Sequence, residues 1–262
     1  MPFRICRAIL LSLLTTPLAL PWGIDAHRLT ARIATLHLET KAAAAVAEIL
    51  GPSRTLADVS NLADDVRKTQ PATSPWHYVD IPFDAEGFDR RRDCPGDQCL
   101  IAAIERFRDE LKQPGRRPEA RFEALHNLVH FMGDIHQPFH CVSRHDHGGN
   151  DVKAILLGRH TNLHQVWDSG ILRYLEPDTE AQFERLREIS PANLRVWSGG
   201  TPETWALESH RLAREVGYHF AGNSHGEVVL GRSYARRAAP VVERQLQIAA
   251  IRIAVVLNNI FR

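Results

Sequence analysis

The sequence has few cysteines and almost no net charge, and both shortages exclude classes of protein. Apart from Cys94 and Cys99 there is no second cysteine pair, which a structural zinc knuckle would need. The formal net charge is +1, so no bulk basic field indicates nucleic-acid binding. There is also no N-x-Ser/Thr sequon, so nothing points to a glycosylated eukaryotic secretory product.

A long apolar run occurs only at the N-terminus. Arg4 and Arg7 precede an apolar segment at residues 8–20, which is too short to span a membrane. We therefore predict a signal peptide at residues 1–21 and a mature domain at residues 22–262, secreted or periplasmic and without stable membrane association. Removal of Arg4 and Arg7 leaves 30 basic against 31 acidic residues, an essentially neutral protein.

The cysteines fit an oxidising compartment. Cys94 and Cys99 bracket the sequence CPGDQC, whose Pro-Gly turn favours a small disulfide loop. Cys6 lies in the targeting segment, and Cys141 remains as an odd cysteine that we expect to be a buried thiol.

Apolar periodicity predicts helices along most of the mature chain. The predicted helices cover residues 27–50, 56–67, 100–112, 118–137, 162–174, 181–188, 202–216 and 239–261. Residues 76–81 (WHYVDI) read as a brief extended segment, and residues 152–157 as a strand that reverses at Gly158-Arg159. The fold class is therefore mainly α: a single compact multi-helix domain with a short β-hairpin.

Polar residues are concentrated in the otherwise mostly apolar segment 125–140 (LHNLVHFMGDIHQPFH), most of which is predicted to be helical. His126, His130 and Asp134 recur at intervals of four, so they project from one helix face. His140 follows the helix end that Pro138 imposes. Imidazoles and carboxylates strongly destabilise a buried helix unless something compensates them, and a metal ion does so most simply.

Other possible ligands lie in apolar or helical settings along the chain. They are His27, Asp64, His77, His164 and Asp168. Nitrogen and carboxylate ligands without thiolates suit zinc with coordination positions left open for water, as in catalytic sites. Ligands from several helices match the way helical bundles build multinuclear centres. These residues alone predict a multinuclear metal-dependent hydrolase.

The chain resembles the trinuclear-zinc single-strand nucleases, the S-one and P-one type, which are relatives of the bacterial zinc phospholipases C. The matching segments follow one another from the mature N-terminus nearly to the C-terminus. They are WGIDAH, LADDVR, WHYVD, LVHFMGDIHQPFH, GGN, NLHQVWD, WALES and PVVERQL, between Trp22 and Leu246.

The resemblance implies three zinc sites per chain. The first would use Asp64, His77, His130 and Asp134; the second His140, His164 and Asp168; the third His27, a bridging oxygen of Asp134, and the amino and carbonyl groups of an N-terminal Trp22. His126 is not a ligand in that pattern. Arg67 would support the phosphate and act with Asp134 in catalysis. Tyr78 would stack on the base, Asp80 would hydrogen-bond the base edge, and Asn150 would lie nearby as a further substrate-binding residue.

The implied function is a secreted zinc-dependent endonuclease that cleaves single-stranded DNA and RNA to 5′-phosphorylated products. A 3′-nucleotidase activity is implied as well, and we expect a monomer. Zinc lowers the pKa of bound water to about 7, so no side-chain nucleophile is needed. The alternatives are a zinc-dependent phospholipase C and a non-enzymatic zinc-sequestering or surface protein. No matching ligand is missing, which disfavours the second alternative.

Overall fold

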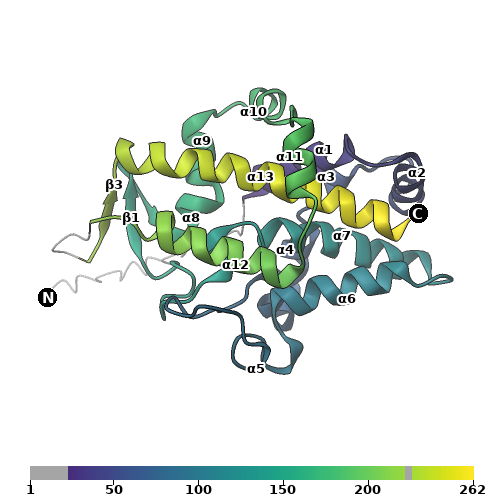
Figure 1. Cartoon of the computed structure of the whole chain (residues 1–262), viewed down its shortest axis with the longest axis horizontal. Coiled ribbons are helices and arrows are strands. Elements are labelled where there is room, and N and C mark those ends of the chain that lie inside the picture. The colour runs from purple at the N-terminus through teal and green to yellow at the C-terminus, as the bar shows by residue number, and fades with distance from the viewer. Residues whose placement is uncertain (1–22, 222–225) are drawn as a thin grey trace, which may run out of the picture.

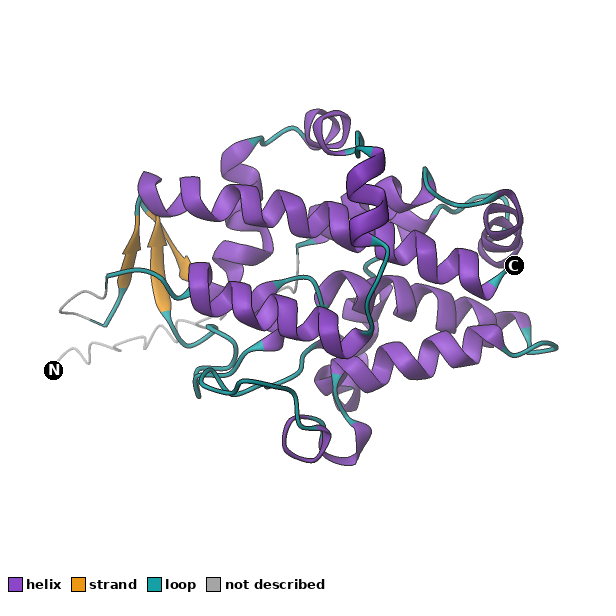
Figure 2. Cartoon of the chain, viewed as in Figure 1, coloured by secondary structure: helices purple, strands orange, loops and turns teal. Residues whose placement is uncertain are grey.

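Helices make up most of the structure, as predicted. The computed structural model describes residues 23–221 and 226–262, and these form one compact, mainly helical domain (Figures 1 and 2). The predicted signal peptide and Trp22 lie outside the described residues. None of the described helices is long and apolar enough to cross a bilayer.

Two pairs of long helices form the core. α7 (Pro118–Asp134) packs along α6 (Leu100–Lys112), and α1 (Ile24–Thr35) packs along α13 (Arg232–Ile260), which runs along much of the molecule in Figure 1. α7 starts at Pro118, where the missing N–H costs nothing. Every residue from 124 to 134 in α7 is buried. The polar residues of this helix are therefore enclosed by neighbouring elements.

The remaining helical elements are short and surround these pairs. They are α2 (Thr40–Leu50), α3 (Leu56–Val59), α4 (Leu62–Thr69), η1 (Pro71–His77), α5 (Arg90–Asp93), η2 (Pro95–Asp97), η3 (Pro138–Cys141), α8 (Leu163–Gln165), η4 (Val166–Gly170), α9 (Ile171–Leu175), α10 (Thr179–Leu186), α11 (Pro191–Trp197), α12 (Pro202–Leu212) and η5 (Ala213–Gly217). α11 was not predicted from the sequence.

A small sheet lies at one end of the molecule (Figure 1). β1 (Lys153–Leu156) and β2 (Arg159–Asn162) form the predicted antiparallel hairpin. Leu157 and Gly158 both have positive φ, the backbone that a two-residue hairpin turn requires. A third strand, β3 (Val228–Leu230), pairs in parallel with β1 and was not predicted. Because β3 has only three residues and pairs with a strand that is far away in the sequence, no local sequence pattern predicts it.

Tertiary contacts interrupt some predicted helices. The predicted helix 27–50 is two helices, α1 and α2, because the turn between them bonds to α13. Asn258 Oδ1 accepts the Glu39 N–H at 2.8 Å, and Asn258 Nδ2 donates to the His37 carbonyl at 3.1 Å. The helix predicted at 239–261 starts earlier, and Pro240 lies inside it. Buried packing along α13 outweighs the one hydrogen bond that this proline removes.

The segment predicted as extended is partly helical. Trp76 and His77 end η1, and extended backbone begins only at Tyr78. The Val79 N–H then donates to the His140 carbonyl at 2.8 Å, which ties this segment to η3, the short helix that follows α7. The predicted disulfide between Cys94 and Cys99 is present, and Cys141 is a buried free thiol as expected.

Candidate metal centre

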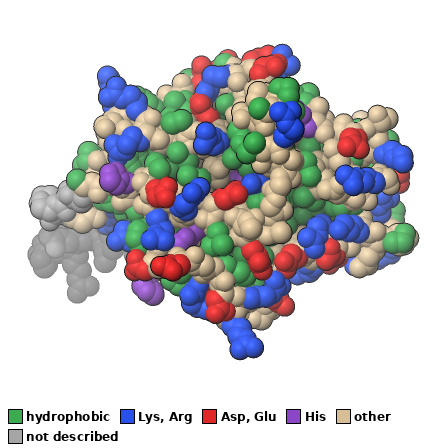
Figure 3. Space-filling model, in the orientation of Figure 1, with side chains coloured by type: hydrophobic (Ala, Val, Ile, Leu, Met, Phe, Trp, Pro, Cys, Tyr) green, Lys and Arg blue, Asp and Glu red, His purple; other side chains and the backbone are tan. Residues whose placement is uncertain are grey.

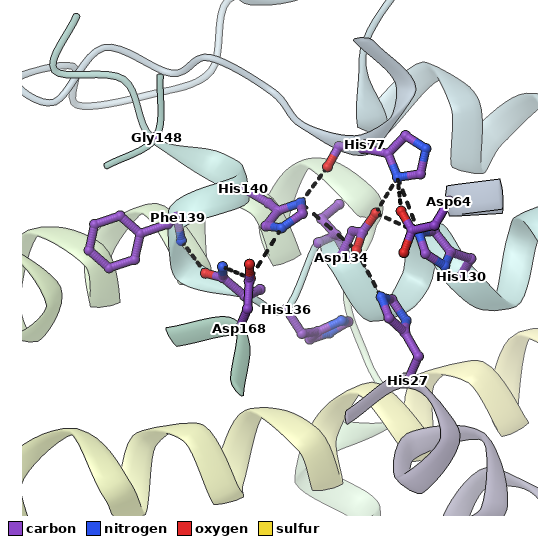
Figure 4. A network of polar contacts seen from close by, with 12 residues as sticks. His27, Asp64, His77, His130, Asp134, His136, Phe139, His140, Gly148 and Asp168 are labelled. Atoms are coloured by element: carbon purple, nitrogen blue, oxygen red, sulfur yellow. Dashed lines mark hydrogen bonds and ion pairs between the residues drawn. The ribbon is translucent and has the colours of Figure 1, made fainter. Parts of the chain in front are cut away.

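Four predicted ligands converge at the end of α7; we call them the first cluster. His77 Nδ1, His130 Nε2 and Asp134 Oδ2 lie 3.0–3.2 Å from one another. Asp64 Oδ1, from α4, lies 3.7 and 3.6 Å from the two ring nitrogens (Figure 4). Ligand atoms about 2.0–2.1 Å from a tetrahedral zinc lie about 3.3–3.4 Å apart. His77, His130 and Asp134 therefore have the spacing that a single ion requires, and Asp64 lies beside two of them.

A second cluster consists of His140, His164 and Asp168. The two Nε2 atoms are 3.2 Å apart, and the Asp168 oxygens lie 3.7 Å from His140 Nε2 and 3.5 Å from His164 Nε2. His164 and Asp168 come from α8 and η4, where the helix widens into a π-helical turn, a feature frequent at functional sites. All three side chains are buried.

The third predicted set is only partly within the described residues. His27 Nε2, from α1, lies 3.2 Å from Asp134 Oδ1, the carboxylate oxygen that faces away from the first cluster (Figure 4). The His27 ring stacks on His130 with centroids 4.1 Å apart. Trp22, the other predicted ligand, lies outside the described residues. His27 and Asp134 thus form a third cluster beside the first.

Backbone carbonyls orient three of the ligand histidines. Nδ1 of each donates a hydrogen bond at 2.5–2.7 Å, so Nε2 is the ring nitrogen that faces the cluster. The histidines are His130, His140 and His164, and the carbonyls are those of Ser60, His77 and Gly148. If both rings are neutral, the Nε2 lone pairs of His140 and His164 face each other across 3.2 Å and repel unless a proton or a metal ion lies between them.

The charges of the first cluster also call for a cation. Burial disfavours a charged His130, yet the carboxylates of Asp134 and Asp64 outweigh it and raise the pKa of His130 to about 9. Burial also opposes the Asp134 carboxylate, but His130 and His140 hold its pKa well below the usual range. Burial lowers the pKa of His77 to about 4, so this imidazole is neutral at neutral pH, as metal binding requires.

The second cluster keeps an unsatisfied oxygen. Asp168 Oδ1 accepts a hydrogen bond from Gln137 Nε2 at 2.6 Å. Asp168 Oδ2 is buried, and no donor in the described part of the chain bonds to it. A buried, unpaired carboxylate oxygen is costly, and a divalent ion would compensate it. The donor atoms of this chain therefore fit zinc in spacing, chemistry and burial.

A cavity of about 180 Å³ adjoins the first two clusters. Its lining includes His77, His140 and His164, together with four residues predicted to bind substrate: Arg67, Tyr78, Asp80 and Asn150. Tyr78 is 40 % exposed, so its ring is accessible. Arg67 Nη2 lies 3.5 Å from Asp64 Oδ1, beside the first cluster. Partial burial in the pocket raises the pKa of Asp80. The structure thus brings the predicted substrate residues together at the clusters.

Gln137 and His147 are among the residues of the site that were not predicted. Gln137, which the sequence marks only as the residue before a helix-ending proline, holds Asp168. His147 lines the cavity, although nothing in its spacing distinguished it from the other histidines. His126, by contrast, is buried beside Phe122 and belongs to none of the possible metal-binding groups of the described residues, consistent with a residue that is not a ligand.

Comparison with known proteins agrees with this geometry. The family model described as S1/P1 Nuclease matches residues 22–262. The chain is 33 % identical to Endonuclease 3 of Arabidopsis thaliana, over 93 % of this chain and 90 % of that protein. It is 34 % identical to Nuclease S1 of Aspergillus oryzae over 57 % of this chain and 54 % of that protein, and 33 % identical to Nuclease P1 of Penicillium citrinum over 56 % and 57 %. Because the family model covers residues 22–262 and Endonuclease 3 is 33 % identical over most of both chains, this protein belongs to the S1/P1 nuclease family.

Proposed function

We propose that the protein is an exported zinc-dependent endonuclease that hydrolyses single-stranded DNA and RNA to 5′-phosphorylated products and also acts as a 3′-nucleotidase. One observation carries the proposal: in a chain of this family, two buried His/Asp clusters adjoin a cavity that also holds Tyr78, Asp80 and Asn150. We infer three zinc ions per chain, held by the first cluster, the second cluster, and the third cluster completed by Trp22.

Zinc at these clusters would lower the pKa of water to about 7 and so supply hydroxide for attack on phosphorus. The described lining of the cavity contains no serine, threonine or cysteine, so a covalent intermediate on those side chains is not expected. Arg67 is placed beside the first cluster, where its guanidinium can hold a phosphate oxygen. Its role is to position the phosphodiester against the clusters.

The outer part of the cavity suits a nucleobase. A base stacked on the accessible Tyr78 ring gains about 1–3 kcal/mol, whatever its identity. Asp80 and Asn150 add polar atoms that can bond to the base edge. A base inside a duplex has to be flipped out before it can enter such a pocket, so single strands are the favoured substrate.

The disulfide and the N-terminal sequence support an exported enzyme, and we also propose that it is monomeric. Basic and acidic side chains are interspersed over the face shown in Figure 3, which gives no broad charged patch on that face for a duplex or membrane. The Cys94–Cys99 disulfide favours an oxidising compartment, in line with a signal peptide at residues 1–21.

One assay tests the proposed function. Single-stranded DNA, duplex DNA, RNA, 3′-AMP and phosphatidylcholine are incubated with the purified mature enzyme, with chelator, and with chelator followed by zinc. We expect cleavage of single strands and 3′-AMP, loss with chelator and recovery with zinc. Hydrolysis of phosphatidylcholine without cleavage of any nucleotide would establish the phospholipase C alternative instead.

A further inference from the structure

The GGN loop, which we define as residues 144–151, lines part of the cavity and also contacts a metal ligand. The Gly148 carbonyl accepts a hydrogen bond from His164 Nδ1 at 2.7 Å. Because a carbonyl can only accept, this bond places a proton on Nδ1 and leaves Nε2 facing the second cluster, whatever the charge of the ring. The position of the loop therefore decides how His164 is aimed.

The loop also lies very close to the backbone beside another ligand. Gly148 has φ 59°, and a Cβ at this position would collide with the carbonyl oxygen of Phe139. A Cβ at Gly149 would lie 2.9 Å from the Phe139 ring. Phe139 directly precedes the ligand His140. The two glycines thus permit a close fit, and a displaced loop would disturb both histidines of the second cluster.

The Asp146 carboxylate holds the GGN loop together. Its Oδ1 accepts the Gly149 N–H at 3.1 Å and the Arg144 N–H at 3.3 Å. The Tyr218 hydroxyl donates to the same carboxylate, 2.8 Å from Oδ2 and 3.0 Å from Oδ1. Burial and the hydrogen bond to Asp146 raise the pKa of Tyr218 well above its usual range, so the hydroxyl remains a proton donor at neutral pH.

Tyr218 is fixed by packing. It follows η5 and is buried, with its ring edge-on to Phe83 at 5.4 Å and tilted against Phe139 at 4.9 Å between centroids. The ring therefore keeps its place whether or not the hydroxyl is present. The hydroxyl fastens the loop to a rigid part of the core.

A second hydrogen-bond chain joins the same turn to the other side of the cluster. The Gly217 carbonyl accepts from the Tyr234 hydroxyl at 2.7 Å, and that hydroxyl accepts the indole N–H of Trp167 at 2.7 Å. Trp167 directly precedes the ligand Asp168 on η4. Residues 217 and 218 are thus connected to the segments that carry both His164 and Asp168.

We propose that Tyr218 and Asp146 are positioning residues for the second zinc site. The hydroxyl fixes the carboxylate, the carboxylate fixes the GGN loop, and the Gly148 carbonyl aims His164 at the ion. Neither Tyr218 nor Asp146 belongs to the metal-binding groups or the cavity lining of the described residues, so each acts through the loop. This inference rests on the proposed function, because it concerns an ion that the function requires.

Competition with a zinc chelator tests the inference without measuring turnover. Tyr218→Phe keeps the packed ring and removes only the donor. Partners that bond directly to metal ligands change metal affinity about 10–100-fold, and Tyr218 acts at a greater distance, so we expect about a threefold to tenfold loss at one site. Zinc affinity at the first cluster should not change.

Variants of Asp146 test whether the two residues act in series. Asp146→Ala also leaves the Gly149 N–H without its acceptor and should weaken the same site more than Tyr218→Phe does. Adding Tyr218→Phe to Asp146→Ala should cause no further loss, because the effects of residues in one hydrogen-bond chain are not additive. Asp146→Asn keeps an acceptor for the Gly149 N–H and should recover most of the affinity. If Tyr218→Phe does not fold, the comparison of Asp146→Ala with Asp146→Asn decides.

Tyr174→Phe is the matched control, because Tyr174 is 42 % exposed and lies outside the cavity lining. It should bind zinc as the wild type does. Thermal unfolding of the metal-free proteins identifies a merely structural role: lower stability with unchanged zinc affinities in Tyr218→Phe, or equal weakening at every site, would overturn the inference alone. A wild type that binds no zinc would overturn both the inference and the proposed zinc dependence.

Discussion

Replacing Gln137 with leucine tests whether an amide outside the ligand set controls one metal site. Gln137 is completely buried, and its Nε2 donates to Asp168 Oδ1 at 2.6 Å. Its Oε1 accepts the Phe139 N–H at 2.5 Å, one residue before the ligand His140. The amide therefore positions two ligands of the second cluster: it directs Asp168 Oδ2 toward the ion and fixes the turn that carries His140.

The expected loss follows from these contacts. A hydrogen bond to a charged group contributes about 1.5–3 kcal/mol, and leucine leaves both the Asp168 oxygen and the Phe139 N–H unpaired. Changes to partners that orient metal ligands typically lower metal affinity about 10–100-fold, which is about 1.4–2.7 kcal/mol. We expect Gln137→Leu to weaken zinc at the second cluster by this factor and to leave the first cluster unchanged.

Competition between the protein and a zinc chelator measures the affinity of each site. Gln245→Leu is the matched control, because Gln245 is a buried glutamine whose amide bonds to the His136 carbonyl at 3.0 Å and not to a ligand side chain. The control should lose folding stability but keep all zinc affinities. If Gln137→Leu binds every zinc as tightly as wild type, the assigned role of the amide is wrong.

Four further predictions address the other parts of the site. The zinc content measured by elemental analysis should approach three ions per chain, and Asp134→Ala should lower it more than any other single ligand change. A content of one zinc per chain in a fully active preparation would contradict the three-site assignment. Tyr78→Ala should raise KM for nucleotides and leave hydrolysis of a base-free phosphodiester nearly unchanged. Equal losses of activity on the two substrates would show that the ring does not bind the base. Because burial raises the pKa of Asp80, its carboxylate becomes protonated at a higher pH than that of an ordinary aspartate, so KM for nucleotides should rise as the pH falls through that pKa. Asp80→Asn should lose this pH dependence of KM. If the variant shows the same dependence as the wild type, Asp80 is not its cause. N-terminal sequencing of the active enzyme should find Trp22 as the first residue, because only a free amine can bind zinc. Full activity and three bound zincs with Leu20 still attached would refute a role of the Trp22 amine.

Local spacing predicts the part of the site that lies on one helix. His130 and Asp134 are four residues apart on α7, so helix geometry alone places them together. Asp64 and His77 reach the same ion site from α4 and η1, and nothing in their spacing specifies that meeting; it was predicted from the resemblance to a family. The disulfide and the hairpin were predictable for the same local reason, because both close within a few residues.

The rest of the site depends on the tertiary path of the backbone. The carbonyls that orient the ligand histidines belong to Ser60, His77 and Gly148, and any residue type offers a carbonyl. Ser60 follows the end of α3, at the break that divides the predicted helix 56–67. Neither that break nor the left-handed backbone at His147 has a sequence signal strong enough to predict it.

The position of Asp134 explains why metal binding and folding should be coupled in this protein. Asp134 is the last residue of α7 and is fully buried, so its carboxylate adds to the negative end of the helix dipole. Asp64 and Asp168 place two more buried carboxylates beside it. Such a concentration of negative charge opposes folding unless cations compensate it. In the absence of metal, a proton on His130 can supply one positive charge, which is why its pKa is raised. Metal ions in the folded clusters would supply more charge and would bind the unfolded chain less well, so we expect metal to stabilise the part of the core that is most costly to bury.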